Sequence, residues 1–211
     1  MAETEPTEPT EEIVETQIKD LDPRFVKQLE SAERSIDKNP GYTIDICATI
    51  LAKYPSCVDV RKIMRQAQFK KYGKGNPVAK LSGDVQGMVL SMKAPSMIKK
   101  GQALEVMAQA EHLLSQCPQN ASALKALASA AESLSYWGTA ASAYMAIAQF
   151  QPKNEKNLLA LANAYVKNKQ PDEAAQVCEQ ILRRNPTNGD AQALARSASV
   201  IKTMNKGNWV K

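Results

Sequence analysis

Three prolines, Pro118, Pro152 and Pro186, recur with a fixed period of 34, and each is followed two positions later by an asparagine. A proline has no backbone N–H and pushes the preceding residue out of the helical region, so each one marks the end of a helix. The asparagine can cap the next helix by accepting a hydrogen bond from an early backbone N–H. This fixed period therefore predicts an array of helix-turn-helix units that stack on one another through apolar faces.

The residues between the prolines repeat the same helical pattern in successive units. With each proline placed at position 32, complete units cover residues 121–154 and 155–188. Apolar residues recur every three or four positions within each predicted helix, which is the spacing of one buried helix face. Small residues are expected where paired helices approach closely, namely at Ala128, Ala140, Ala162 and Ala174.

This pattern resembles the tetratricopeptide repeat family, whose units carry a small residue at positions 8 and 20 and a proline at position 32. The resemblance is strongest over residues 121–188. It implies an all-α fold, a right-handed helix-turn-helix solenoid in which stacked units form a superhelix. It also implies a non-enzymatic scaffold for protein–protein interaction.

The same register extends to both ends of the chain. Pro55 places a further unit at about residues 24–57, in which Phe25, Leu29, Ala32 and Ile36 follow helical spacing. Because the interval from Pro55 to Pro118 is nearly twice the period, the second unit, 58–120, is predicted to carry an insertion at 72–100. This insertion would lie between one helix before Tyr72 and another after Gly101. Residues 189–205 predict a single helix that caps the last apolar face.

The two ends of the chain differ in charge. Residues 1–20 hold seven acidic residues and one lysine with few apolar side chains, so we expect a disordered acidic tail. Residues 206–211 form a short basic tail. The start of the sequence lacks the basic and apolar stretches of a secretory signal, and no apolar run reaches the ~18 residues that a membrane span needs. The expected location is the cytoplasm.

Residue types that carry chemistry are sparse. The four cysteines form no C-x-x-C pair, and His112 is the single histidine. We therefore expect no metal site and no cofactor, and we expect His112 to be solvated. Phosphate-binding loops, nucleophile elbows and paired catalytic carboxylates are also missing from the sequence, so an enzyme is not predicted.

In the family, the first helix of each unit lines the concave wall of the superhelix. By resemblance, the groove residues here are Ser122, Lys125, Ser129, Glu132, Lys156, Leu159, Asn163, Val166 and Lys167. Lysines beside Leu159 and Val166 suit a protein or peptide partner that carries carboxylates and one or two apolar anchors. The alternative is that these side chains form the solvated face of amphipathic helices.

A second possible surface is the basic stretch from Arg61 to Lys100, which has ten Lys or Arg and one acid, Asp84. Its cations are Arg61, Arg65, Lys70, Lys71, Lys74, Lys80, Lys93, Lys99 and Lys100, together with Lys62. Such a patch could bind nucleic acid or an anionic surface, which is the alternative function. Nucleic acid is the less favoured ligand because only Phe69 and Tyr72 could stack on bases.

The insertion also contains a methionine-rich segment, residues 85–98. Either this segment folds back on the solenoid as an extra helix, or it is held out as an adaptable surface for a partner. Folding back is favoured, because a solvated loop would not carry so many apolar side chains. Self-association of the array remains open at this point.

Overall fold

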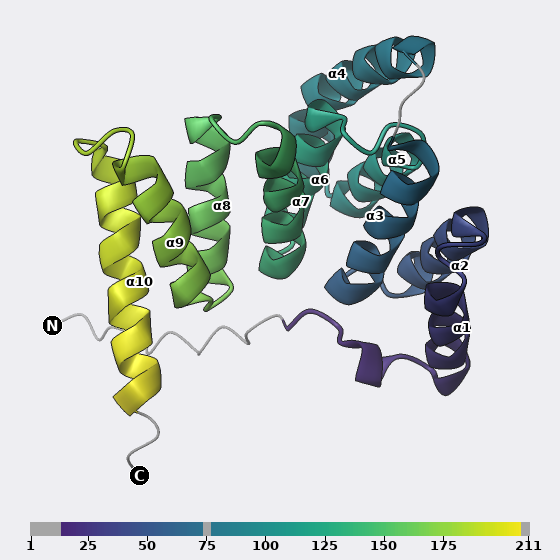
Figure 1. Cartoon of the computed structure of the whole chain (residues 1–211), viewed down its shortest axis with the longest axis horizontal. Helices are drawn as coiled ribbons and strands as arrows, with labels where there is room; N and C mark the ends of the chain where they lie inside the picture. The colour runs from purple at the N-terminus through teal and green to yellow at the C-terminus, as the bar shows by residue number, and fades with distance from the viewer. Residues whose placement is uncertain (1–13, 74–76, 208–211) are drawn as a thin grey trace, which may run out of the picture.

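The computed structural model describes residues 14–73 and 77–207, with the side chains of all of these except 77–80 and 206–207. All regular secondary structure in these residues is helical, as the repeat period predicts. Most of the predicted acidic tail and the end of the basic tail lie outside the described residues. The elements (Figure 1) are a 3-10 turn η1 (Ile18–Asp20) and the helices α1 (Pro23–Arg34), α2 (Pro40–Lys53), α3 (Val58–Tyr72), α4 (Pro77–Lys99), α5 (Ala103–Leu114), α6 (Ala121–Ser133), α7 (Trp137–Phe150), α8 (Glu155–Lys167), α9 (Pro171–Leu182) and α10 (Gly189–Gly207).

The asparagines that follow the periodic prolines cap helices as predicted. The side chain of Asn120 accepts a hydrogen bond from the backbone N–H of Ala123 at 2.9 Å, at the start of α6. Asn154 and Asn188 make the equivalent bond at the starts of α8 and α10, at 3.1 and 2.8 Å. These bonds satisfy backbone donors that have no partner within the helix, so they fix where each unit begins.

From α4 to α10, each helix packs antiparallel against the next and shares one apolar core with it. The four alanines expected at close helix contacts, Ala128, Ala140, Ala162 and Ala174, are fully buried. Alanine keeps neighbouring backbones close and loses no side-chain rotamers on burial, so these positions set the spacing of the array.

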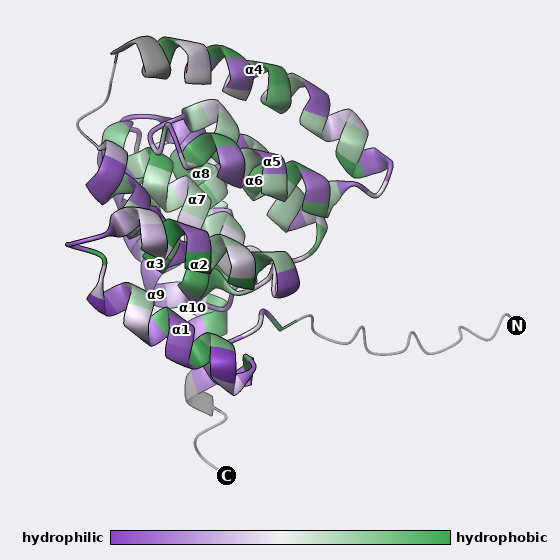
Figure 2. Cartoon of the chain, turned by 90° about the vertical axis from the view of Figure 1, so that its right-hand side faces the viewer, coloured by the Kyte–Doolittle hydropathy of each residue, from purple (hydrophilic) through white to green (hydrophobic). Residues whose placement is uncertain are grey.

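The segment predicted as an insertion folds back on the array as α4, which packs against both α5 and α6. Figure 2 shows α4 along the upper edge of the molecule, over these two helices. This arrangement corrects the predicted pairing of α3 with α5 inside one unit, because α5 instead forms a hairpin with α4. The tight turn between them uses Gly101, whose φ of 77° is a left-handed conformation that favours glycine.

Close contact between α4 and α6 depends on two glycines one helical turn apart. Asn120 donates a hydrogen bond from its amide to the carbonyl oxygen of Gly83 at 2.6 Å. A Cβ atom placed on Gly87 would lie 2.3 Å from the side-chain oxygen of Asn120. Asn120 therefore caps α6 and anchors α4 at the same time, and both functions need a small residue opposite it.

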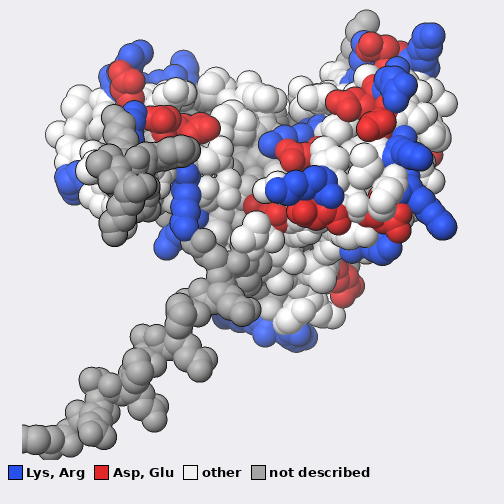
Figure 3. All heavy atoms as spheres, turned by 90° about the horizontal axis from the view of Figure 1, so that it is seen from below, with Lys and Arg blue, Asp and Glu red and all other residues white. Residues whose placement is uncertain are grey.

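The first three helices form a separate apolar core, which extends from Leu21 to Ala67. In this part α2 packs against α1 and α3, and α3 also contacts α7 (Figure 1). The contact between α3 and α7 joins segments that are distant in the sequence, with three helices between them. Seen from below, the surface of the molecule is hollowed between two lobes (Figure 3).

Candidate functional site

A cleft of about 790 Å³ lies between α3 and α7, and residues around the turn from α8 to α9 complete its wall. Three cations line it, Lys62, Arg65 and Lys70, all on α3. Among the described residues that line the cleft there is no Asp or Glu. Large apolar groups also line it, namely Val58, Phe69, Met145 and Tyr165.

Each of the two main walls is one face of a helix. The lining residues recur every three or four positions, as Val58, Lys62, Arg65 and Phe69 on α3 and as Gly138, Ala141, Met145 and Gln149 on α7. This spacing places side chains one above another along a single face. The opposite side of α3 is buried in the first core, so the helix is held rigidly while it presents its cations to the cleft.

The two lysines of the cleft make ion pairs with acids that do not line it. The Lys62 amine lies 3.1 Å from Asp59, and the Lys70 amine lies 2.6 Å from Asp37. The hydrogen bond from Lys70 lowers the pKa of Asp37. All four side chains are largely exposed, and exposed pairs of this kind contribute little to stability. Both lysines can therefore turn to an anionic ligand at small cost.

Arg65 connects the cleft to a buried ionic cluster between the two cores. Its guanidinium donates to Glu111 at 2.9 Å, and Arg61 donates to the other oxygen of the same carboxylate at 2.9 Å. Arg61 also donates to the carbonyl oxygen of Pro55 at 2.9 Å. Burial lowers the pKa of Arg65, while the charge of Glu111 opposes this shift. One carboxylate thus holds α3 against α5 through two guanidinium groups.

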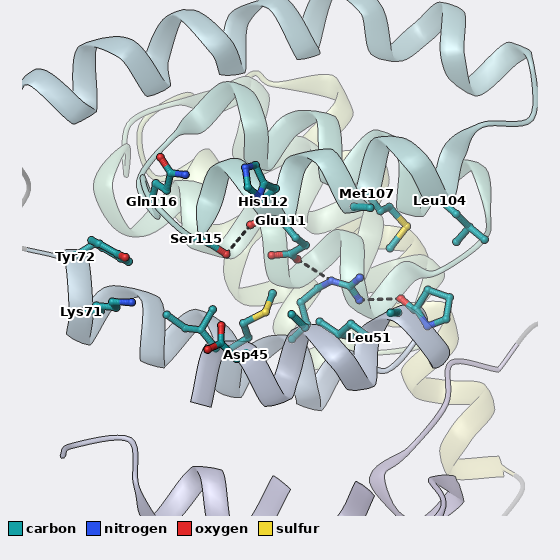
Figure 4. Close-up of a pocket in the computed structure, with 17 residues that line it drawn as sticks. Asp45, Leu51, Lys71, Tyr72, Leu104, Met107, Glu111, His112, Ser115 and Gln116 are labelled. Carbon is teal, nitrogen blue, oxygen red and sulfur yellow. Dashed lines mark hydrogen bonds and ion pairs between the residues drawn. The ribbon is translucent and has the colours of Figure 1, made fainter. Parts of the chain in front are cut away.

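A second cavity, of about 560 Å³, lies on the other side of α3, against α2 and α5. Figure 4 shows Leu51 and Met107 on its two walls, with Glu111 directed from α5 toward α3. Its lining carries both signs of charge, including Asp45 and Lys71. This cavity therefore has less preference for an anionic ligand than the cleft between α3 and α7.

The N-terminal segment crosses from one wall of the cleft toward the other. The carboxylate of Glu15 accepts a hydrogen bond from the backbone N–H of Gly138, a cleft residue, at 2.5 Å. The next residue, Thr16, bonds through its hydroxyl to the hydroxyl of Ser56 at 2.7 Å, just before α3 begins. A carboxylate and an extended backbone are therefore accommodated at the edge of this cleft.

The groove residues predicted by resemblance lie on α6 and α8. Lys125, Ser129, Lys156 and Lys167 are exposed, whereas Ser122, Glu132, Leu159, Asn163 and Val166 are half-buried. Glu132 accepts a hydrogen bond from the hydroxyl of Tyr144 at 3.2 Å, and burial raises the pKa of Glu132. Tyr165, Asn168 and Gln170 bring the end of α8 to the cleft, but the predicted stripe itself is not part of its lining.

Lys62, Arg65 and Lys70 of the predicted basic stretch line the cleft together, whereas its other cations are dispersed. Arg61 is 4% exposed and Arg65 is mostly buried, and both guanidinium groups pair with Glu111. Lys93 and Lys99 are exposed in the second half of α4, a helix whose 23 residues span about 35 Å, and Lys100 is exposed directly after it. Lys71 lies over the ring of Tyr72, while Lys74 and the side chain of Lys80 lie outside the described residues. On the right-hand lobe in Figure 3, acidic and basic side chains are interspersed.

These features define a helical-repeat protein with clefts between its hairpins. A model of the tetratricopeptide repeat family matches residues 137–198, from α7 into α10. The predicted repeat family is therefore confirmed over this part of the chain, which is similar to tetratricopeptide repeats. No curated protein matches the sequence.

The family is typically non-catalytic and serves as a protein-interaction module. Within residues 14–73 and 77–207, no three His, Cys, Asp or Glu side chains are grouped so that they could hold a metal ion. His112 is exposed, as expected. No helix in the described part of the chain is both long enough and apolar enough to cross a membrane.

Proposed function

We propose that the chain is a protein-interaction scaffold that binds a partner segment in the cleft between α3 and α7. The repeat family supports the general role. The lining of the cleft supports this as the location of the binding site, because cations on α3 face an uncharged wall on α7 and no described lining residue is acidic. The carboxylate of Glu15 is bound at the edge of this cleft, and the field of the cations on α3 favours the approach of a further anionic segment.

The lining also sets the chemistry of the partner. Lys62 and Lys70 are two helical turns apart, so their positions differ by about 12 Å along the axis of α3. Phe69, Met145 and Tyr165 provide apolar surface beside them. The partner segment should therefore carry carboxylates at two positions with a large apolar side chain between or beside them.

The stripe predicted on α6 and α8 offers similar chemistry and remains a second candidate surface for the same function. Lys156 and Lys167 are exposed there, near half-buried Leu159 and Val166. One substitution in each surface separates the two. Met145 is 37% exposed in the cleft, and Leu159 is half-buried in the stripe.

The experiment is affinity capture of the tagged full chain from native lysate at ~150 mM salt, with and without nuclease. Wild type, Met145→Glu and Leu159→Glu are compared, and thermal unfolding checks that each variant folds. We expect wild type to capture a protein in stoichiometric amount, with or without nuclease. Leu159→Glu should capture the same amount of this protein, whereas Met145→Glu should capture about tenfold less.

Two results would overturn parts of this proposal. Loss with Leu159→Glu but not with Met145→Glu would move the site to the predicted stripe. A yield that disappears with nuclease would assign binding to nucleic acid, and the protein-scaffold function would then be wrong.

A further inference from the structure

Helix α4 has apolar side chains on two opposite faces. Its inward face packs against α5 and α6 through Leu90 and Ala94, which are 5% and 2% exposed, and through the buried glycines Gly83 and Gly87. Its outward face carries a set that we call the outer stripe, which consists of Leu81, Val85, Met88, Val89 and Met92. At 3.6 residues per turn, the two sets lie about 180° apart around the helix.

The outer stripe is well exposed. Leu81, Met88 and Met92 are 70%, 60% and 76% exposed, and Val85 and Val89 are 58% and 44% exposed. A surface helix is normally polar on the side away from the core, and a helix that is apolar all round is normally covered on both sides. A contiguous exposed apolar patch of this kind marks an interaction surface. Figure 2 shows α4 at the edge of the molecule, where such a surface is accessible.

The outer stripe differs in chemistry from the cleft between α3 and α7, because none of its five members is charged. An acidic segment of the kind proposed for the cleft would find no cation within the outer stripe. This surface therefore needs a second occupant, and the inference does not depend on the function proposed for the cleft.

We propose that the outer stripe is the interface of a homodimer, in which α4 packs antiparallel against α4 of a second copy. The argument rests on the symmetry of the stripe. Four of its five members, all except Leu81, are arranged evenly about the midpoint between Met88 and Val89, with Val85 as far before that point as Met92 is after it. In a twofold antiparallel pair, Val85 then meets Met92 of the second copy, while Met88 and Val89, on opposite flanks of the stripe, each meet the same residue of the second copy beside the twofold axis. Such an interface is self-complementary, as a twofold axis requires.

The charges beside the stripe are compatible with this pairing. Asp84 and Lys93 lie on opposite flanks of α4, about 180° apart around its axis. An antiparallel pair places Lys93 beside Ser82 and Gln86 of the second copy and Asp84 beside Ser91 of the second copy, so no like charges meet. Covering the stripe on both copies removes on the order of 1,000 Å² of surface, which is about the lower limit for a specific interface. Methionine adapts its shape to such a contact.

The first test is sedimentation equilibrium of the full chain at concentrations from about 1 to 200 μM. We expect wild type to form a dimer in this range and Met88→Glu to be monomeric, because its carboxylates would be buried near the twofold axis. Met204→Glu is the matched control, because Met204 is also exposed, at 65%, but lies on α10. It should dimerise like wild type.

A cross-linking experiment then tests the register. In the antiparallel pair, a chain with both Val85→Cys and Met92→Cys should oxidise to a disulfide-linked dimer. A chain with Val85→Cys alone should not, since the two copies of that residue lie about 10 Å apart along the axis, beyond disulfide reach.

A wild-type chain that stays monomeric up to about 200 μM would overturn the proposal. If Met88→Glu then failed to retain a protein that wild type captures from lysate, the outer stripe would bind that protein instead of a second copy. A dimer that survives Met88→Glu would overturn it as well, because another surface would have to hold the copies together.

Discussion

Glu15 caps helix α7 through Thr139, a residue 124 positions later in the chain. Its carboxylate accepts hydrogen bonds from the backbone N–H of Thr139 at 2.8 Å and from the hydroxyl of Thr139 at 2.6 Å. Thr139 is fully buried, and the start of a helix favours negative charge. The contact ties the N-terminal segment to the repeat array across the boundary between the two apolar cores.

Glu15→Ala should therefore lower the free energy of unfolding by about 1 kcal/mol, which is typical for the loss of a helix cap. It should also expose the segment before α1 to proteases, because its anchor on α7 is lost. Urea unfolding and limited proteolysis measure the two effects. Glu15→Gln keeps an acceptor and should lose less stability. An alanine variant as stable and as resistant as wild type would show that the cap contributes nothing.

Glu111 should be among the most sensitive charged residues of the chain. Glu111→Ala leaves the guanidinium groups of Arg61 and Arg65 buried without their shared carboxylate. Breaking a buried ion pair in this way costs about 3–5 kcal/mol, because the remaining charges stay desolvated. Urea unfolding gives the value.

Glu105→Ala is the matched control for this prediction, because Glu105 lies on the same helix, α5, but is exposed. Its effect should stay within about 0.5 kcal/mol. Equal losses for the two variants would mean that the cluster around Glu111 does not hold the two cores together.

Gly87→Ala should displace α4 from the array. The new Cβ atom would approach the side chain of Asn120, whose position is fixed by its own bonds to Gly83 and Ala123. Overpacking of this kind costs about 1–3 kcal/mol. Thermal unfolding measures the loss. The sulfur of Cys117 lies against Gly83 of α4, so a displaced α4 should let a thiol reagent label Cys117 faster.

The control for Gly87 is Gly189→Ala at the start of α10, where an added Cβ atom meets no other atom within 4 Å. This variant should be neutral or slightly stabilised, since alanine restricts the unfolded chain. If Gly87→Ala were equally neutral, the contact between α4 and α6 would be looser than the geometry indicates.

The helix ends were predictable from the sequence because their causes are local. A proline stops a helix and an asparagine two positions later caps the next one, so Asn120, Asn154 and Asn188 could be assigned without any tertiary information. The packing of α4 against α6 was not predictable in this way. It depends on two glycines that fit against Asn120, and the repeat period contains no signal for that contact.

The cleft was missed for a related reason. The cleft exists because α3 contacts α7, and the repeat register does not indicate that these two helices are neighbours. Composition was misleading at Arg61, which belongs to a strongly basic stretch yet is buried against Glu111, 50 residues later. Local patterns reveal which side chains are charged, whereas burial of a charge depends on a partner that is distant in the sequence.

Cys47 predicts how stability should depend on pH. The residue is fully buried, and burial raises the pKa of its thiol to about 12 from an ordinary value of 9.0. Above about pH 9, the unfolded chain loses this proton while the folded chain keeps it. Stability should therefore fall as pH rises, by up to about 1.4 kcal/mol per pH unit from this group.

Urea unfolding between about pH 8 and 10 compares wild type with Cys47→Ala to isolate this contribution. At the lower pH, wild type should have the larger free energy of unfolding, because alanine leaves a small void. The difference in free energy of unfolding should shrink as pH rises, because only wild type carries the buried thiol. Cys117→Ala is the control, because that thiol is only half-buried and its removal should change the pH slope less. A constant difference between wild type and Cys47→Ala across this range would show that the Cys47 thiol ionises at the same pH in the folded and unfolded chain.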